Sequence, residues 1–512
     1  MRPILISMIL VLSSTASGDE RTEARVGPNT QATPDLAAAT ADQAAAKPKG
    51  QAQTGWIFPG SWSGAYEADS GVKVGPDTTR FHDALRQRFI AGAAYTGRLL
   101  KANLSLSIYA YDGVSSVDAD QSFTRPIDLN QAFIEYRSPV GLWRAGVTQS
   151  RWGLGLVAGG RSAYSSLTHD FHFATPSDMP AGLTYGLKLG AWTLGLSGAF
   201  VLRDENADLL EGDRAQQGVV VLRYQPSTAN WLGVYSAYRR QRDADDSTLT
   251  ALLVDLAGAT ELPIGASDRL RLAFEAAYLQ GDTDRSLSEA AFAADQDLMT
   301  LQAFGGAAVA GFETMNRRLA IELEAGYASA DRNAEDSQLT RFTFDDNYGV
   351  GMILVRGLLR HSHELAVERS SDPNRVGQPQ RGLDRLKTQG RLAGVTYANL
   401  RSSYRIKSGK MATGLHIGAV IAALPQGSAD PYQSFRQGSP VNAFGQDSAS
   451  DLGLELNTGI TWSARLQRRY ALRLSLEGAA AQPGAAIRGA ESSTIMMVRT
   501  GFTLRALEKE MN

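Results

Sequence analysis

The chain has 512 residues, of which 43% are hydrophobic and 20% charged, and it contains no cysteine. Without thiols it forms neither disulfides nor cysteine-ligated zinc sites, and it lacks the lipid-accepting cysteine of a bacterial lipoprotein. The 51 basic and 53 acidic residues leave a formal net charge of -2, which excludes a general electrostatic attraction to nucleic acid.

The N-terminus has the pattern of a secretory signal peptide. Arg2 precedes a short apolar stretch that ends at Leu12, and small residues follow from Ala16 to Gly18. This pattern predicts a signal peptide over residues 1–18 and export from the cytoplasm. The alternative is a short buried segment at the N-terminus.

Residues 19–54 are rich in Ala, Thr, Gln, Asp, Glu and Pro and contain almost no aromatic residues. Such a segment buries too little apolar surface to offset the entropy lost on ordering. We therefore expect a disordered periplasmic leader. The alanine-rich stretch from Ala37 to Ala46 offers one alternative, a marginal helix, because alanine is the strongest helix former.

Within residues 98–112, apolar and polar side chains alternate from Leu100 to Tyr111. Leu104 and Ile108 lie in one register, whereas Lys101 and Ser107 lie in the other. A period of two places the two sets on opposite faces of a strand. The pattern recurs to the C-terminus in segments long enough to cross a bilayer at a tilt, which predicts an outer-membrane β-barrel.

Short and long connections alternate along residues 55–512, as in barrels with tight periplasmic turns and longer outer loops. The resulting fold class is all-β, a transmembrane antiparallel barrel of about 18 strands, with 16 to 20 left open by this count. The predicted strands are residues 60–69, 80–95, 98–112, 128–138, 140–150, 181–190, 191–203, 215–226, 229–241, 247–263, 267–282, 297–313, 316–330, 390–407, 410–424, 450–465, 468–481 and 492–506.

Residues 331–389 are the exception to this alternation of short and long connections. Successive strands alternate in direction only if this whole segment stays on the outer side of the membrane. Loops of this length are uncommon unless they serve a function. We expect a constriction or plug loop. An ordinary surface loop is the first alternative, and two further strands around residues 348–360 are the second.

Aromatic residues mark the two expected membrane interfaces. Trp143, Trp192 and Trp231 each lie a few residues after a short turn, and Tyr278 and Tyr327 lie near the opposite strand ends. Tryptophan and tyrosine are enriched at both edges of the lipid-facing band of a barrel. The sequence therefore predicts two aromatic girdles. Aromatic residues in the core of a soluble sheet are the alternative.

The register opposite to the apolar one carries most of the charged residues of the predicted strands. A charge on the lipid side costs about 2–4 kcal/mol for Arg or Lys at the bilayer midplane, so these residues are expected to face the lumen. The predicted pore-lining residues are Arg86, Arg88, Lys101, Glu135, Arg137, Arg144, Arg271, Glu275, Glu322, Glu324, Arg401, Glu455, Arg473 and Arg499.

A barrel of this size is wide enough for an aqueous channel, and rings of charged side chains filter solutes by sign and size. Arginine is somewhat favoured among the predicted lumen residues, which indicates an anionic or polyhydroxylated solute. Alternatively, the arginines and glutamates pair across neighbouring strands and stabilise the inner wall.

Residues 128–160 combine paired strands, a Pro-Val-Gly turn and the exit Trp152-Gly-Leu-Gly155. This patch resembles the alginate-export porins and related uncharacterised proteobacterial barrels, and Phe342 to Tyr348 resembles the aromatic, Asn-rich start of their outer loop. The resemblance implies an 18-stranded, arginine-lined pore for an acidic polysaccharide. The lumen predicted here is more mixed in charge.

The C-terminal strand from Arg499 to Ala506 resembles the signal that barrel-assembly machinery recognises. It lacks a terminal aromatic residue and carries the charged tail from Glu508 to Asn512. The expected partners are this machinery during biogenesis, outer-membrane lipid and lipopolysaccharide, and a hydrophilic solute.

No catalytic motif stands out, and we expect neither an enzyme nor a bound cofactor. The histidine pairs at 169–172 and 361–363 lack a third metal ligand at a recognisable spacing, so no metal site is predicted. His416 is expected to be a wall residue. The sequence therefore favours a passive outer-membrane channel, with a plugged or surface-binding barrel and an outer-membrane hydrolase as alternatives.

Overall fold

The structure is a computed structural model. The signal peptide and almost all of the leader predicted from the sequence lie outside the residues that it describes. These residues are 54–74, 77–79, 82–115, 127–158, 178–204, 206–265, 267–285, 287–288, 297–331, 336–345, 348–371, 380–381, 392–408, 411–427, 429–466, 470–487, 490–491 and 494–506.

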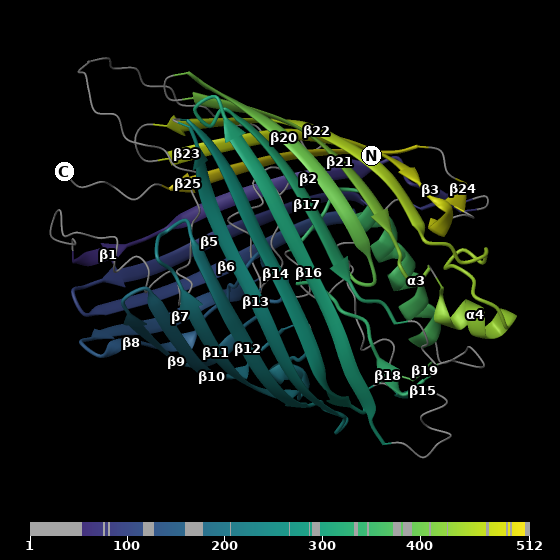
Figure 1. The fold of residues 1–512 in the computed structure, drawn as a ribbon, viewed down its shortest axis with the longest axis horizontal. Helices are drawn as coiled ribbons and strands as arrows, with labels where there is room; N and C mark the ends of the chain where they lie inside the picture. The colour runs from purple at the N-terminus through teal and green to yellow at the C-terminus, as the bar shows by residue number, and fades with distance from the viewer. Residues whose placement is uncertain are drawn as a thin grey trace. The chain divides into compact units, whose positions relative to one another are not determined.

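Within these residues, 18 antiparallel strands form one closed barrel (Figure 1), as the sequence predicts. Each strand pairs with its neighbours in chain order, and the last strand pairs with the first through the register Glu67↔Arg499. The strands are β2 (Gly60–Asp69), β5 (His82–Thr96), β6 (Leu100–Ser115), β7 (Ile127–Ser138), β8 (Gly141–Val147), β9 (Pro180–Leu189), β10 (Trp192–Val201), β11 (Arg214–Tyr224), β12 (Trp231–Arg242), β13 (Thr248–Ile264), β14 (Asp268–Thr283), β16 (Met299–Thr314), β17 (Leu319–Ala328), β20 (Thr396–Ser408), β21 (Met411–Ala423), β22 (Asp451–Leu466), β23 (Tyr470–Pro483) and β25 (Ile495–Ala506).

Smaller elements lie before the first barrel strand or in the connections between the barrel strands. They are β1 (Gly55–Ile57), β3 (Val72–Val74), β4 (Asp77–Thr79), β15 (Leu287–Ser288), β18 (Gln338–Leu339), β19 (Gln380–Arg381), β24 (Ala490–Glu491), η2 (Leu209–Glu211), η3 (Leu354–Leu359), α3 (Arg360–Ser371), α4 (Pro431–Gln437) and η5 (Ala485–Ile487). None of the helices within the described ranges is long and apolar enough to cross a membrane.

The two ends of the barrel differ, as the alternation of turns predicts. At the short-turn end, neighbouring strands join through a few residues, such as Gly190 and Ala191 between β9 and β10. Gly190 has φ 62°, a left-handed conformation that glycine adopts without steric cost. At the long-loop end, β17 and β20 are joined by residues 329–395. This segment holds β18, η3, α3 and β19, and the predicted 18 strands need no further barrel strand from it.

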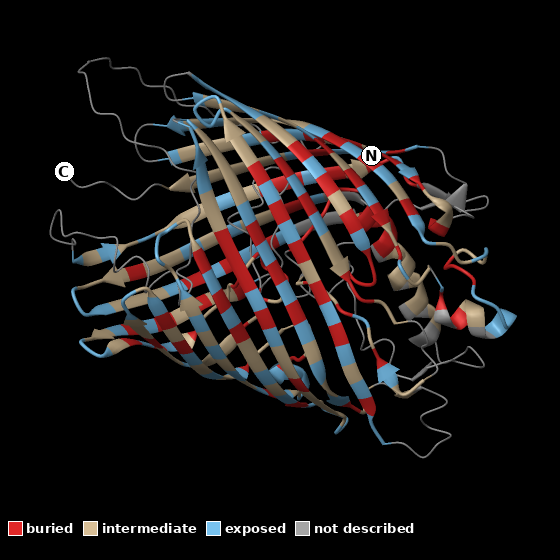
Figure 2. Cartoon of the chain, in the orientation of Figure 1, coloured by how far each residue is buried: buried red, intermediate tan, exposed pale blue. Residues whose placement is uncertain are grey.

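The barrel wall is apolar outside and charged inside, the reverse of a water-soluble protein. Buried and exposed residues alternate along its strands (Figure 2). On β7, Ile134 and Tyr136 are 57% and 47% exposed, whereas the intervening Glu135 is 1% exposed. The same alternation places Leu456 of β22 outside and Glu455 inside. The strict period of two, which fixes the face of every side chain, therefore accounts for this inversion.

Outward-facing aromatic residues gather at both ends, as predicted, except at one position. Trp143 and Trp192 are exposed at the short-turn end, and Tyr278 is exposed towards the other end, where Tyr327 stacks on a phenylalanine ring at 5.3 Å. The prediction for Trp231 is wrong, because its ring is only 8% exposed and faces the lumen. Its distance from the turn fits a girdle, but its register is that of the inner face.

Candidate functional site

The inner wall carries every predicted lumen residue, and the role of these residues in lining a pore stays a prediction. Nine of the fourteen are at most 7% exposed: Arg86, Glu135, Arg144, Glu275, Glu322, Glu324, Arg401, Glu455 and Arg499. The other five are half-buried: Arg88, Lys101, Arg137, Arg271 and Arg473.

A chain of ion pairs crosses the seam where the first and last strands meet. Glu67 of β2 accepts hydrogen bonds from Arg86 of β5 and from Arg499 of β25. Arg499 also donates through Nε to Glu477 of β23 at 2.7 Å, and His416 of β21 lies 3.5 Å from Glu477. His416 is thus a wall residue, as predicted. These charges join the neighbouring strands β5, β2, β25 and β23, and they also reach β21. This arrangement matches the alternative prediction, in which arginines and glutamates pair across strands and stabilise the inner wall.

A second group of charges lies on β17 and β20. Arg401 donates to Glu322 and, at 2.7 Å, to Glu324. The hydroxyls of Tyr348 and Tyr397 donate to the same Glu324 carboxylate at 2.5 and 2.9 Å. Tyr348 belongs to the long connection after β17, so this group attaches that connection to the wall. Burial, followed by the charge of Glu324, raises the pKa of Tyr348 well above its ordinary value.

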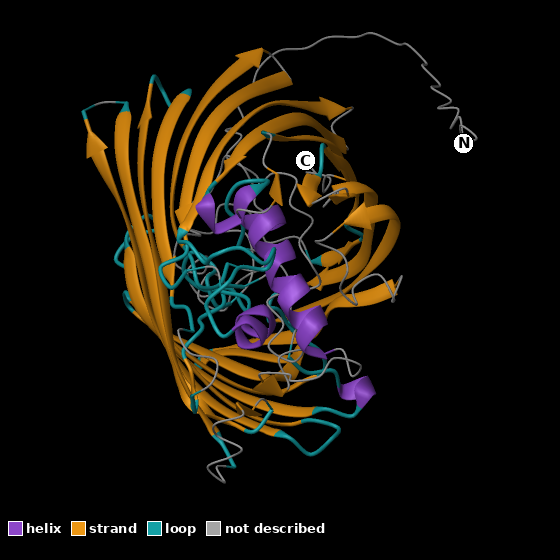
Figure 3. Cartoon of the chain, turned by 90° about the vertical axis from the view of Figure 1, so that its right-hand side faces the viewer, coloured by secondary structure: helices purple, strands orange, loops and turns teal. Residues whose placement is uncertain are grey.

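Two connections from the long-loop end fold into the barrel and bind its inner wall (Figure 3). The first is residues 151–158, between β8 and β9. The backbone N–H groups of Leu154, Gly155 and Leu156 all donate to the carboxylate of Glu275 on β14, the last two at 2.9 and 3.0 Å. Trp152 donates its indole N–H to Asp255 of β13 at 3.1 Å. We call residues 151–158 the first inserted segment.

Residues 348–359 form the second inserted segment, and they bind the wall in the same way. The N–H groups of Met352, Ile353 and Leu354 donate to the carboxylate of Glu455 on β22 at 2.6, 2.9 and 2.9 Å. Gly351 precedes them with φ 67°, and a Cβ there would lie 2.8 Å from a carboxylate oxygen of Glu455. Each inserted segment is therefore held by one buried glutamate that satisfies three successive backbone donors.

The two inserted segments belong to one apolar cluster inside the barrel. Asp345, just before the second segment, donates its N–H to the carbonyl of Leu156 at 2.7 Å. Leu154 and Leu156 of the first segment and Leu354 and Leu358 of the second are at most 2% exposed and pack in this cluster. Part of the lumen is therefore filled with packed hydrocarbon. Residues 348–359 are not an exposed surface loop, and their role as a constriction stays a prediction.

The wall formed by β5, β6 and β7 keeps half-buried polar groups instead. Arg88 donates to Ser107 at 3.0 Å and to Asn130 at 3.2 Å, and its guanidinium lies 5.3 Å from the ring centre of Tyr109. Within the described part of the chain, the partners recorded for Arg88 are all uncharged. No carboxylate of the described residues therefore neutralises its positive charge.

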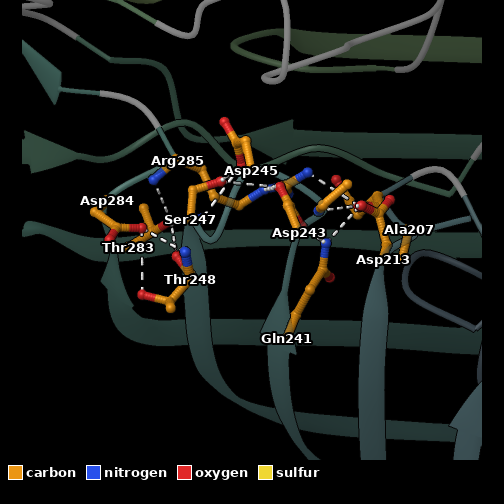
Figure 4. A network of polar contacts seen from close by, with 12 residues as sticks. Ala207, Asp213, Gln241, Asp243, Asp245, Ser247, Thr248, Thr283, Asp284 and Arg285 are labelled. Carbon is orange, nitrogen blue, oxygen red and sulfur yellow. Dashed lines mark hydrogen bonds and ion pairs between the residues drawn. The ribbon is translucent and has the colours of Figure 1, made fainter. Parts of the chain in front are cut away.

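The rim at the long-loop end is held by a polar network (Figure 4). Asp243 accepts a hydrogen bond from Arg285 at 2.6 Å, and Asp284 accepts one from the hydroxyl of Thr248 at 3.2 Å. Asp213 accepts the N–H of Ala244 at 3.0 Å. The carboxylates thus pair with arginine, hydroxyl and backbone donors, and they join the loops after β10, β12 and β14.

The predicted absence of a metal site is not tested at residues 169–172, which lie outside the described residues. His361 and His363 lie on α3, where burial is the first cause that lowers their pKa values to about 4 and about 3. Both are neutral at pH 7. Among the residues with described positions, no three His, Cys, Asp or Glu side chains are placed to share a metal ion.

The predicted lumen residues did not include Glu67 or Asp255, and the inward course of residues 151–158 was not predicted. Glu67 and Asp255 do lie in the charged register of their strands, so parity was the signal that could have identified them. The path of the first inserted segment depends on hydrogen bonds to Glu275, about 120 residues away in the chain, and no local pattern encodes it.

No protein-family model matches the chain, and neither does any curated protein sequence. Among solved structures, the chain is similar to OccK11 (OpdR) of Pseudomonas aeruginosa, with 11% identity, a TM-score of 0.47 and coverage of 88% of this chain and 96% of that one. The outer membrane protein OpdK of the same organism gives 9%, 0.46, 88% and 98%. OccAB1 of Acinetobacter baumannii gives 10%, 0.46, 88% and 97%.

Proposed function

We propose that this chain is a channel of the bacterial outer membrane, through which a hydrophilic solute passes passively along a charged lumen. The observation that carries the proposal is the closed 18-stranded barrel with apolar side chains outside and charged side chains inside. Only an environment of hydrocarbon stabilises an outer face of exposed leucine, isoleucine and phenylalanine. We propose no cofactor and no catalytic step.

The inserted segments give the channel its selectivity. Eighteen strands alone would enclose a wide aqueous pore. Residues 151–158 and 348–359 reduce its cross-section, because they pack as a dry cluster against β13, β14, β20 and β22. The solute then passes along the remaining wall of β5 to β8, where Arg88, Lys101 and Arg137 are half-buried.

The solute we favour is anionic or polyhydroxylated and small. Arg88 has uncharged partners, and Arg137 keeps 43% of its side chain exposed beside its ion pair with Glu135 at 3.3 Å, so both can meet an anion or a hydroxyl group. The resemblance of residues 128–160 to alginate-export porins implies an acidic polysaccharide. Buried carboxylates such as Glu135 and Glu324 pair with Arg144 and Arg401, so few arginine charges remain for a long polyanion, and we favour a short anion.

The second candidate function is a plugged or surface-binding barrel. It is favoured by the buried hydrogen bonds that attach both inserted segments to the wall, since these bonds would hold a permanent plug equally well. Among the residues that the structure describes, no contact favours the hydrolase alternative.

Planar-bilayer recording of the purified full-length protein separates the two candidates. The channel predicts stepwise conductance from the intact protein, and a larger conductance when residues 340–391 are replaced by a short Gly-Ser linker. A current from the deletion variant alone would support the plug. If neither protein conducts, although resistance to SDS in unheated samples shows that both barrels are folded, the channel hypothesis is overturned.

A further inference from the structure

A groove runs along the outward face of the wall between β9 and β12. Gly198 of β10 and Gly218 of β11 are register partners, and a Cβ at either position would meet no atom within 4 Å. The absence of two adjacent side chains leaves a hollow of about 440 Å³. Its flanking side chains are Leu183, Tyr185, Leu196, Val220, Ser236 and Tyr238.

Three arginines lie on the same outward face, directly above the groove at the long-loop end. Arg242 of β12 is the register partner of Arg214 on β11, and Arg240 lies two residues nearer the groove, in register with Gln216. All three are exposed. Arg242 forms an ion pair with Asp246 at 2.7 Å. For Arg214 and Arg240, the described residues supply no carboxylate partner.

The position of these arginines along their strands places them at the edge of the hydrocarbon layer of the membrane. On β11, Tyr224 lies at the short-turn end, and its ring contacts the girdle residue Trp192 at 5.0 Å. Ten residues separate it from Arg214; at about 3.3 Å per residue and a tilt of about 40°, they span about 25 Å, the thickness of the lipid-facing band. The arginines thus meet headgroups, and the groove meets acyl chains.

We propose that the arginines and the groove together bind lipopolysaccharide, the phosphorylated and multiply acylated glycolipid of the outer leaflet. The lipid A phosphates lie on Arg214 and Arg240, and one acyl chain fills the hollow over Gly198 and Gly218. The site rests on the proposed outer-membrane location, but it does not require that the barrel conduct.

Charge decides between a lipid and a second copy of the chain. A symmetric dimer through this groove would place each arginine cluster near its own copy, because a two-fold interface brings the same patch of both subunits together. Like charges at such a contact are unfavourable. An anionic lipid instead neutralises the arginines and matches the apolar groove below them.

Native mass spectrometry of the purified full-length protein in detergent, with lipid A added, tests the site. The double variant Arg214→Gln/Arg240→Gln is expected to bind lipid A about 25-fold more weakly, since each basic residue near an anionic lipid surface contributes about a factor of five. The control Arg98→Gln/Arg465→Gln makes the same charge change at the short-turn end and should bind like the wild type.

The groove is tested separately by Gly218→Leu, which fills the hollow, against Gly478→Leu, which adds the same bulk to the outward face of β23, where a Cβ meets no atom nearer than 3.8 Å. Weaker binding of lipid A by Gly218→Leu alone supports the acyl-chain site. Equal binding of dephosphorylated lipid A, or of phosphatidylglycerol, would overturn the choice of lipopolysaccharide. If the protein forms a dimer and Gly218→Leu dissociates it, the groove is a contact between two copies, and the proposed lipid site is overturned.

Conductance of the arginine double variant distinguishes this proposal from the channel itself. The outward arginines do not face the lumen, so its conductance should equal that of the wild type. Lipid A binding by a protein that never conducts would contradict the proposed function and leave the lipid site standing.

Discussion

Glu275 and Glu455 show how single side chains organise the lumen. Each carboxylate accepts three successive backbone N–H groups from an inserted segment. Those backbone donors lie away from water, and a buried donor without a partner costs about 1–3 kcal/mol. The two glutamates therefore determine where residues 151–158 and 348–359 lie.

Glu455→Gln should loosen the second inserted segment, because an amide has one acceptor oxygen where the carboxylate has two. Losing one to two of the three hydrogen bonds predicts that the amides of residues 352–354 exchange with solvent about tenfold or more faster. Hydrogen–deuterium exchange measures this. Glu313→Gln, on β16 at the short-turn end, is the control, and unchanged exchange in Glu455→Gln would contradict the assigned role.

Gly351→Ala should perturb the same segment for a steric reason. Alanine at φ 67° places its Cβ 2.8 Å from Glu455, in addition to the backbone cost of about 1–2 kcal/mol. Gly190→Ala is the matched control, because φ is 62° there and a Cβ meets no neighbour. We expect altered single-channel conductance in Gly351→Ala only. Identical traces from both variants would show that the contact with Glu455 does not matter.

At the scale of elements, alternation of apolar and polar residues determined most of what the sequence could predict. The strand count was confirmed because the face of each side chain follows from a period of two and each turn reverses the direction. Trp231 was assigned wrongly because distance from a turn was used without parity, and one residue reverses the face. The second inserted segment was predictable only as part of an unusually long connection, and the first was not predicted, since their partners Glu455 and Glu275 lie about 100 and about 120 residues away.

The outward face of a strand should tolerate a charge only near its ends. Leu456→Arg, near the middle of β22, should destabilise the barrel by about 2–4 kcal/mol, whereas Leu466→Arg at the end of the same strand should cost at most about 1 kcal/mol. Urea unfolding in lipid vesicles, followed by tryptophan fluorescence, compares the two. Equal losses at both positions would contradict a hydrocarbon-facing wall.

At the scale of the whole molecule, closure depends on the contact between β2 and β25. Register pairing joins the two strands, and buried charges on Glu67, Arg499 and Glu477 reinforce the seam from inside. Sequence parity placed Arg499 on the inner face but could not identify Glu67, 432 residues away, as its partner. The barrel therefore closes through two strands from opposite ends of the sequence, a pairing that no local sequence pattern encodes.

Arg499→Gln should weaken the seam. It removes the cation between two buried carboxylates, and breaking a buried ion pair typically costs about 3–5 kcal/mol. The barrel should therefore lose its SDS-resistant, fast-migrating form at a lower temperature than the wild type, as heat-modifiability gels report. Arg98→Gln removes an exposed arginine at the short-turn end and should leave that temperature unchanged, and the same temperature for both variants would refute the seam's contribution.

Passage of solute through the intact protein tests the central claim most directly. Vesicles containing the full-length chain and loaded in parallel with galactose or galacturonate should release both solutes faster than protein-free vesicles, and Arg88→Gln should slow galacturonate more than galactose. Release no faster than from protein-free vesicles, with the barrel folded and inserted, would contradict the account.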